Sequence, residues 1–370
     1  MTCEYFGSCG ACVVYDEGYT GQLRQKLELN KERFLDFFDG DISVFESLDI
    51  HYRSRSEFKI WHDGETIHYA MNNVDKTKGA VFVAECPQVN SHINQLMPKL
   101  LNLIKEKGID FKLFGVDFLC AQSGEMVVSF LYHRQLDDSW LDQAKEIAEI
   151  LDIYVIGRAR KQKIVVGQDF ITESLFIQKR EYKFNYIENS FTQPNTKVNE
   201  QMISWALSQL DGAGGDLLEL YCGAGNFTIP FATKFTKVLA TEISKSSIDA
   251  AKTNMQLNDV KNIEFIRMGV EEFTDALDGV REFRRMKDIA IESYDFSTIF
   301  VDPPRSGMDY ATCLFSTRFD NILYISCNPE SLLRDLKIIC STHTVVSMAL
   351  FDQFPYTHHV EMGVKLIKKR

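Results

Sequence analysis

Five short apolar segments, separated by stretches with helical periodicity, dominate the second half of the chain. They lie at residues 217–221, 237–241, 263–268, 298–301 and 322–326. Strands that are apolar on both faces and alternate with helices are typical of a parallel sheet covered on both sides. We therefore predict that residues 181–370 form an α/β domain of the doubly wound, Rossmann-like kind.

The first half has a different pattern and predicts a separate α+β domain over residues 1–180. Helical spacing of apolar residues covers 21–38, 90–107 and 139–151, and strands are expected at 111–120, 126–132 and 153–158. Polar and apolar residues alternate on both sides of Asp63-Gly64, which indicates a hairpin between residues 50 and 72. A chain of 370 residues fits two such domains better than one.

The net charge of the chain narrows the classes of function that it could have. A formal net charge of -11 argues against nonspecific coating of nucleic acid. Basic residues cluster in two segments, 53–59 and 158–163. The favoured interpretation is that they form the solvated face of a strand, and the alternative is that they bind RNA. Without an apolar run long enough for a bilayer or a signal peptide, we expect a cytoplasmic protein with no membrane partner and no obligate protein partner.

A glycine-rich turn follows the first strand of the second half. In GDLLELYCGAGNF the strand runs into Gly223-Ala224-Gly225, where glycines let the backbone turn and approach a ligand. About twenty residues further on, Glu242 ends the next predicted strand and is placed to accept hydrogen bonds from a ribose. This spacing alone leaves NAD and S-adenosylmethionine (SAM) as equal alternatives.

The fourth strand favours SAM. It ends in Asp302-Pro303-Pro304-Arg305, where two prolines fix a rigid loop and let the Asp302 carboxylate face a ligand. Dehydrogenases do not need such an element, so an NAD-dependent oxidoreductase is disfavoured. The plain alternative is an ordinary turn with a surface aspartate.

The fifth strand delivers a cysteine to the same edge of the sheet. Cys327 follows ILYIS, and Asn328-Pro329 ends the strand before a helix. A helix N-terminus lowers a thiol's pKa, so we predict a nucleophile here rather than an inert core thiol. Near the end of the chain, LFDQFPYTHHVE offers a proton acceptor; the spacing of His358, His359 and Glu361 lacks the helical HExxH form of metal sites, so Glu361 is interpreted as a general base.

Together these residues resemble the tRNA (uracil-5-)-methyltransferases, the TrmA family, over nearly the full chain. The matching stretches are HYRSRSEFKIWHDG, ENSFTQPN, LLELYCGAGNF, ATEI, VDPPRSG, LYISCNPE and LFDQFPYTHHVE. The resemblance implies a SAM-dependent methyltransferase domain preceded by an RNA-binding domain, acting on the T-arm uridine 54 of tRNA to form 5-methyluridine. It also implies SAM contacts from five residues: Gln193, Tyr221, Asn226, Glu242 and Asp302.

The chemistry of that family explains why a thiol and a base are needed. C5 of uracil is a weak nucleophile, and addition of the Cys327 thiolate to C6 makes it an enolate that can accept the methyl group of SAM. Glu361 would then remove the C5 proton so that the thiolate can leave.

One feature departs from the best-known tRNA enzymes. Cys3, Cys9 and Cys12 form C-x5-C-x2-C, and Cys86 precedes a proline. Such a set suits an iron-sulfur cluster or zinc, and it is similar to the [4Fe-4S] motif of the ribosomal uridine-5 methyltransferases. A set of cysteines that binds nothing is the alternative.

Two alternative functions stay open at this point. The first is a 23S ribosomal RNA uridine-C5 methyltransferase that carries a [4Fe-4S] cluster. The second is a tRNA-folding chaperone in which methylation is secondary.

Overall fold

The five apolar segments of the second half form the parallel strands predicted for them. The computed structural model, which describes residues 2–75 and 79–370, places them in an eight-stranded sheet of order β1-β16-β17-β15-β14-β11-β12-β13. The strands of this sheet are β1 (Ser43–Phe45), β11 (Asp216–Leu220), β12 (Val238–Glu242), β13 (Ile263–Arg267), β14 (Phe296–Val301), β15 (Asn321–Ser326), β16 (His343–Phe351) and β17 (Glu361–Lys368). β17 runs antiparallel between β15 and β16, which the sequence did not predict.

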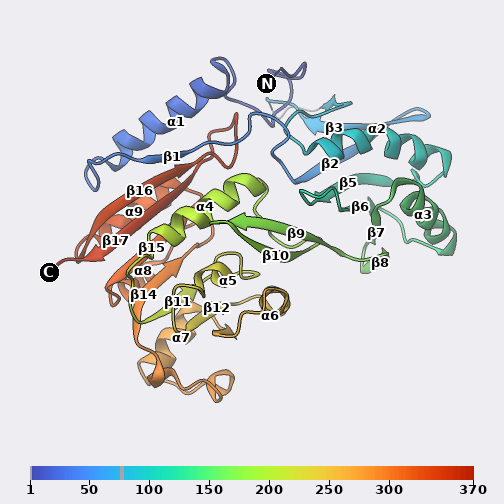
Figure 1. Cartoon of the computed structure of the whole chain (residues 1–370). Helices are drawn as coiled ribbons and strands as arrows, with labels where there is room; N and C mark the ends of the chain where they lie inside the picture. The colour runs from blue at the N-terminus through green and yellow to red at the C-terminus, as the bar shows by residue number, and fades with distance from the viewer. Residues whose placement is uncertain (1, 76–78) are drawn as a thin grey trace.

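Helices cover both faces of this sheet, as its strands require (Figure 1). One face packs against α4 (Thr196–Ser208), α5 (Thr228–Phe231) and α6 (Lys245–Leu257). The other packs against α1 (Gly18–Phe34), α7 (Val270–Leu277), α8 (Tyr310–Ser316) and α9 (Pro329–Ile339). Every residue of β11 is buried as a result, and the doubly wound α/β prediction is confirmed.

The first half contributes a seven-stranded sheet of order β4-β3-β2-β5-β6-β7-β8. Its strands are β2 (Arg55–Asp63), β3 (Thr66–Asn72), β4 (Ala80–Phe82), β5 (Leu113–Cys120), β6 (Met126–Tyr132), β7 (Tyr154–Ala159) and β8 (Gln162–Val166). The predicted hairpin is present, and Gly64 adopts φ 58° in its turn. α2 (Ser91–Glu106) and α3 (Asp138–Leu151) pack on one face of the sheet and form its apolar core.

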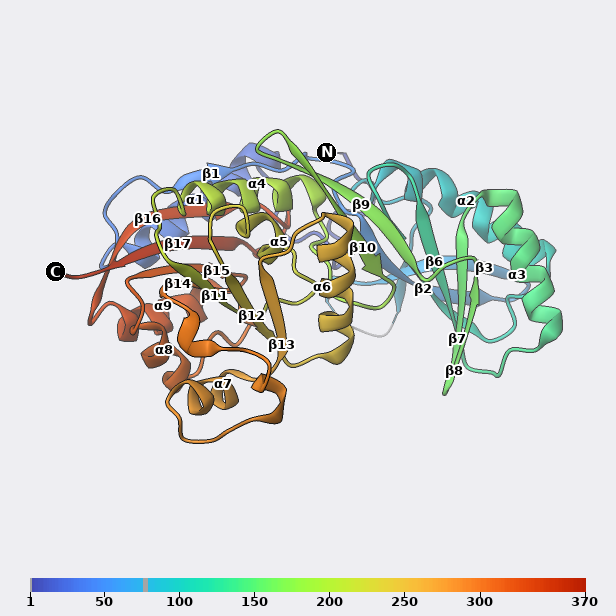
Figure 2. The ribbon, with the colours of Figure 1, turned by 60° about the horizontal axis from the view of Figure 1, so that its bottom comes forward.

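A long hairpin links the two sheets (Figure 2). It consists of β9 (Phe170–Ile177) and β10 (Arg180–Ile187), so the predicted boundary near Arg180 falls at its turn. Two short 3-10 helices, Arg284–Met286 and Ile291–Ser293, complete the secondary structure of the described residues. Since α1 and β1 pack on the C-terminal sheet, the two sheets do not divide the chain at a single point.

The described part of the chain contains no helix that is both long and apolar enough to cross a membrane.

Candidate active site

The site lies at the carboxyl ends of the parallel strands, where the strand order reverses. β11 is flanked by β12 on one side and β14 on the other, the position at which doubly wound sheets bind ligands. The turn after β11 needs left-handed backbone at three residues: Tyr221 (φ 62°), Gly223 (φ 54°) and Gly225 (φ 84°). Glycine adopts this conformation without steric cost, so the glycine pattern is explained by the turn.

A single cavity of about 740 Å³, which we call the crevice, opens at this turn. Its wall includes all seven residues predicted as catalytic or cofactor-binding: Gln193, Tyr221, Asn226, Glu242, Asp302, Cys327 and Glu361. These residues come from six separate loops and strand ends, so their convergence is a property of the fold. The volume is that of a site for a cofactor-sized molecule.

Three of these side chains are held in place by hydrogen bonds. Glu242 accepts from Gly223 N (3.2 Å) through Oε2 and from Ser244 N (2.8 Å) through Oε1. Asn226 exchanges two amide hydrogen bonds of 2.9 Å with Asn199. Both side chains therefore present a fixed edge to the crevice.

The third, Gln193, is positioned by a neighbouring amide. Its Oε1 accepts a hydrogen bond of 2.7 Å from Gln353 Nε2, and both side chains are buried. The Gln193 NH2 group has no partner among the described residues and is free to donate to a ligand.

Asp302 ends β14 as predicted and is strongly perturbed. Burial raises the pKa of its carboxyl to about 7. The carboxylate has no hydrogen-bond donor among the residues that the structure describes. A cation or a hydroxyl donor in the crevice would therefore stabilise its charged form.

Cys327 and Glu361 lie side by side, brought together by strand register. β15 and β17 pair antiparallel with Ser326 opposite Met362, so the next positions on the two strands are Cys327 and Glu361. Glu361 is almost completely buried, and burial, reinforced by the charge of Asp302, raises its pKa well above the usual value. A carboxylate with a raised pKa next to a thiol is suited to proton abstraction.

The expected low pKa of the Cys327 thiol is wrong for the ligand-free structure. Burial raises the pKa to about 11, and the negative charges of Glu361 and Asp302 raise it too, whereas Arg305 opposes them. The thiol does lie at the start of α9, but two carboxylates and partial burial outweigh the helix N-terminus. A positive charge in the crevice would be needed to form the thiolate at neutral pH.

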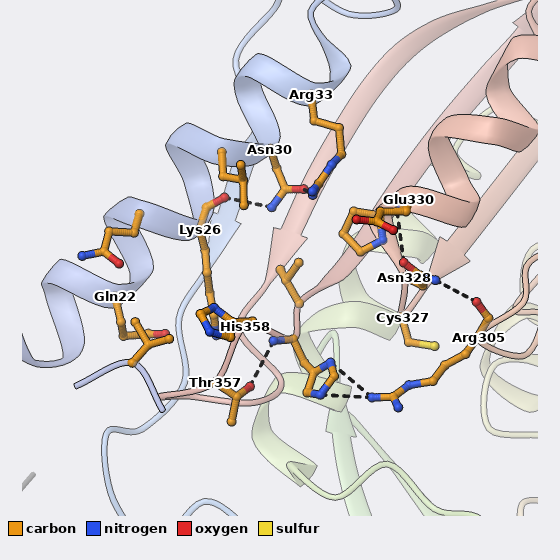
Figure 3. Close-up of a pocket in the computed structure, with 16 residues that line it drawn as sticks. Gln22, Lys26, Asn30, Arg33, Arg305, Cys327, Asn328, Glu330, Thr357 and His358 are labelled. Atoms are coloured by element: carbon orange, nitrogen blue, oxygen red, sulfur yellow. Dashed lines mark hydrogen bonds between the residues drawn. The ribbon is translucent and has the colours of Figure 1, made fainter. Parts of the chain in front are cut away.

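Arg305 lies beside the thiol, and His358 and His359 line the same cavity (Figure 3). Arg305 Nη2 lies 3.1 Å from His359 Nδ1, and the charge of Arg305 helps burial to lower the pKa of that imidazole. A neutral His359 accepts a hydrogen bond from the guanidinium and so holds Arg305 beside Cys327. Among the described residues, no group of three or more His, Cys, Asp or Glu side chains has the geometry to hold a metal ion.

One crevice residue was missed by sequence reasoning. Glu219, in the middle of β11, lines the crevice and is 1% exposed, and burial raises its pKa well above the usual range. Its Oε2 has no hydrogen-bond partner among the described residues. The signal in the sequence was the single acidic residue inside the apolar segment LLEL, because burying a carboxyl group in a strand covered on both faces is costly unless a partner stabilises it.

The four predicted ligand cysteines also converge. Cys3, Cys9, Cys12 and Cys86 line one small pocket. Burial, together with the charges of the other three thiols, raises the pKa of Cys12 to about 12. The structure does not place three of them in the geometry of a single metal ion.

The two basic segments are largely paired with protein groups. Arg158 forms a two-point ion pair with the buried Glu188, and Lys163 contacts Asp169 (2.6 Å). Arg55 Nη1 donates to the backbone oxygen of Ser190 (2.5 Å). These segments contribute structure as well as surface charge.

Comparisons with known proteins found matches over nearly the whole chain. The model of the family described as tRNA (Uracil-5-)-methyltransferase matches residues 18–369. A protein of Sulfurimonas denitrificans named tRNA/tmRNA (uracil-C(5))-methyltransferase is 67% identical over 370 residues, covering all of both chains. Proteins of the same name from Sulfurovum sp. and Cellvibrio japonicus are each 50% identical, over 100% and 95% of this chain and 100% and 96% of theirs.

A solved structure shares the fold. The tRNA (uracil-54, C5)-methyltransferase of Pyrococcus abyssi, determined in complex with S-adenosyl-L-homocysteine, superimposes with a TM-score of 0.70 at 22% identity. The match covers 95% of this chain and 84% of the other.

Proposed function

Because the chain belongs to the tRNA (uracil-5-)-methyltransferase family, we propose that it transfers a methyl group from SAM to C5 of a uridine in tRNA. The observation that carries the mechanism is the pairing of Cys327 and Glu361 at the wall of the crevice. We propose the T-loop uridine at position 54 as the target, in keeping with the name of the Pyrococcus abyssi enzyme that shares the fold. The names of the bacterial relatives add tmRNA as a second substrate.

The reaction proceeds by addition and elimination. The Cys327 thiolate forms a bond to C6 of the uracil, and the electron pair of the C5–C6 double bond becomes an enolate. C5 then attacks the methyl carbon of SAM, which releases S-adenosyl-L-homocysteine. Glu361 takes the proton from C5, the C5–C6 double bond forms again, and the Cys327–C6 bond breaks to regenerate the thiolate.

SAM is held by the crevice residues. Glu242 accepts from the ribose hydroxyls, with its carboxylate already oriented by two backbone N–H groups. Gln193, Tyr221, Asn226 and Asp302 complete the binding set. Glu219 lines the crevice with a buried carboxyl group whose charged form the cationic donor stabilises on binding.

The positive sulfonium activates the nucleophile. Burial raises the pKa of Cys327, and the charges of Glu361 and Asp302 add to this effect; a cation beside these groups lowers the pKa of the thiol and of Asp302 together. The thiolate therefore forms chiefly when the methyl donor is bound. This order protects the enzyme from adding to a uridine that it cannot methylate.

The N-terminal domain, residues 1–180, is proposed to bind the T-arm of tRNA. A uridine in a folded loop must be turned out of its stack to reach Cys327. Recognition of the surrounding RNA shape therefore has to come from surfaces outside the crevice.

We propose that Cys3, Cys9, Cys12 and Cys86 bind a [4Fe-4S] cluster. Support comes from the shared pocket, from the mutual influence of the four thiols, and from Gln88 Nε2, which donates to Cys12 Sγ as protein amides do to cluster sulfurs. Anaerobic purification with iron and sulfide analysis and an absorption spectrum tests this. A metal-free, fully active protein, or zinc without sulfide, contradicts it.

The methylation reaction is tested with purified protein, labelled SAM and unmodified transcripts. We expect methylation of tRNA, with mass spectrometry of nuclease fragments placing 5-methyluridine at position 54. Methylation only of 23S ribosomal RNA fragments would overturn the tRNA assignment and leave the chemistry intact. A biological effect that survives Cys327→Ala would favour a chaperone role.

A further inference from the structure

A second cavity adjoins the crevice at the nucleophile. It has a volume of about 520 Å³ and lies between α1 on one side and the loop 357–360 and the start of α9 on the other (Figure 3). We call it the α1 cavity. It shares Cys327, Arg305 and His359 with the crevice, so the two spaces meet at the reacting thiol.

The α1 cavity has a positive wall in an acidic protein. It is lined by Lys26, Arg33 and Arg305, whereas Glu330 is the one acidic residue among its described lining residues. Lys26 is already neutralised by a buried ion pair with Asp352. The charge available to a ligand therefore comes from the two arginines.

Neither arginine has a carboxylate partner among the described residues. Arg33 donates from Nη1 to Asn30 Oδ1 (2.8 Å), which fixes the side chain without neutralising it. Arg305 contacts only the imidazole of His359 and keeps its charge. Two oriented guanidinium groups facing one cavity are suited to phosphate oxygens, which they bind with paired hydrogen bonds.

The cavity also has an unpaired acceptor. Gln22, which lines it, is 1% exposed and donates from Nε2 to Asp352, but its Oε1 has no hydrogen-bond partner among the described residues. A buried acceptor without a donor is costly, so a ligand with a hydroxyl group would relieve it after a small movement of the amide. Anionic oxygens and hydroxyl groups together describe a sugar-phosphate.

We propose that the α1 cavity binds the sugar-phosphate backbone next to the target uridine, with Arg33 and Arg305 each contacting a backbone phosphate. This rests on the proposed function, since it requires an RNA substrate. When the uracil lies at Cys327, its backbone has to continue into a space connected to the thiol, and the α1 cavity begins there. Arg33 is then a specificity-determining residue supplied by a helix at the other end of the chain from the nucleophile.

The first test compares Arg33→Gln with Arg24→Gln. Both remove one arginine charge from α1, but Arg24 pairs with Glu17 on the surface and does not line the cavity. Arg33→Gln should weaken binding of unmodified tRNA about tenfold and reduce the slope of log K against log salt by about 1. The affinity for SAM and the melting temperature should stay unchanged, and Arg24→Gln should leave tRNA affinity within about twofold.

The second test locates the phosphate. T-arm RNAs carry a neutral methylphosphonate at one position at a time, up to two nucleotides either side of the target. At one position the substitution should weaken wild-type binding about tenfold but leave the binding of Arg33→Gln nearly unchanged, because the two changes remove the same contact. Arg33→Lys, which retains the charge, should recover part of the affinity.

The outcomes distinguish a failure of RNA binding at the α1 cavity from a failure of the proposed methyltransferase function. If the wild-type protein methylates tRNA but no methylphosphonate position couples to Arg33, the α1 cavity does not bind the RNA backbone. If Arg33→Gln weakens inorganic phosphate binding but not RNA binding, the cavity takes a free anion instead and the proposal is overturned. If the wild-type protein methylates no RNA, the proposed function itself fails.

Discussion

Cys327 and Glu361 occupy opposite positions where β15 and β17 leave the sheet, because Ser326 pairs with Met362. The nucleophile and the base are thus placed by one strand register rather than by loops. A shift of one residue in this register would turn Glu361 to the other face of the sheet.

Removing the nucleophile should stop the reaction without affecting the donor site. Cys327→Ala should lower methyl transfer to tRNA by roughly 10³-fold or more, with the affinity for SAM within threefold of wild type. Calorimetry for SAM and tritium transfer from labelled SAM measure the two effects. Cys340→Ala, a half-buried cysteine that caps the far end of α9, is the control and should retain activity.

Removing the base should trap an intermediate. In the Glu361→Gln variant the bound uracil can still receive the methyl group, but no base takes the C5 proton, so the Cys327–C6 bond persists. We expect a protein–RNA adduct on a denaturing gel that contains the transferred methyl group. An adduct that does not form, while free methylated tRNA accumulates at the wild-type rate, would remove Glu361 from the role of base.

The reactivity of the thiol should report the charges around it. Cys327 has a pKa of about 11 in the ligand-free protein, so iodoacetamide should modify it slowly at pH 8.5. The negative charge of Glu361 is one of the contributions that raise this pKa, and Glu361→Gln removes it. Modification at pH 8.5, followed by peptide mass spectrometry, should then be roughly threefold to tenfold faster. An unchanged rate would show that Glu361 does not act on the thiol.

The pH dependence of stability should change when Asp302 is neutralised. Burial raises the pKa of this carboxyl to about 7, above its value near 4 in an unfolded chain. The folded state therefore holds the proton more tightly, and stability falls as the pH rises between these values. Asp302→Asn should raise the free energy of unfolding by about 1–2 kcal/mol at pH 8 and by much less at pH 5. Urea unfolding without SAM measures this, and an equal effect at both pH values would contradict it.

The buried ion pair between α1 and the loop before β17 should be important for stability. Lys26 Nζ lies 2.6 Å from Asp352 Oδ1, and both side chains are buried. Lys26→Met leaves the Asp352 charge without its cation and should lower the free energy of unfolding by about 3–5 kcal/mol. The double variant Lys26→Met/Asp352→Leu should recover much of this loss, whereas Arg24→Ala on the exposed face should change it by less than about 0.5 kcal/mol.

Much of the site could be predicted from local sequence. Gly223, Gly225, Glu242, Asp302 and Cys327 each follow a short apolar strand, and parallel strands end at the same edge of a sheet. Glu361 was interpreted as a base from the polar residues near the end of the chain, but its place opposite Cys327 could not be predicted, because nothing local indicates that β17 inserts antiparallel beside β15.

Other features depend on contacts distant in sequence. The raised pKa of Cys327 comes from burial and from the charges of Glu361 and Asp302, which lie on two other segments, so the residues around Cys327 in the sequence do not reveal it. Glu219 was missed because its burial depends on helices covering both faces of β11. The packing of α1 on the catalytic sheet was equally absent from a pattern that assigned residues 1–180 to one domain.

The insertion of β17 also links the integrity of the sheet to the presence of the base. β16 and β1 reach the rest of the sheet only through β17, in the order β1-β16-β17-β15. Opening of the β15–β17 pairing therefore detaches three strands and withdraws Glu361 in one event. Amide hydrogens of β1, β16 and β17 should exchange as a single cooperative unit, and a partly opened molecule should be inactive rather than altered in specificity.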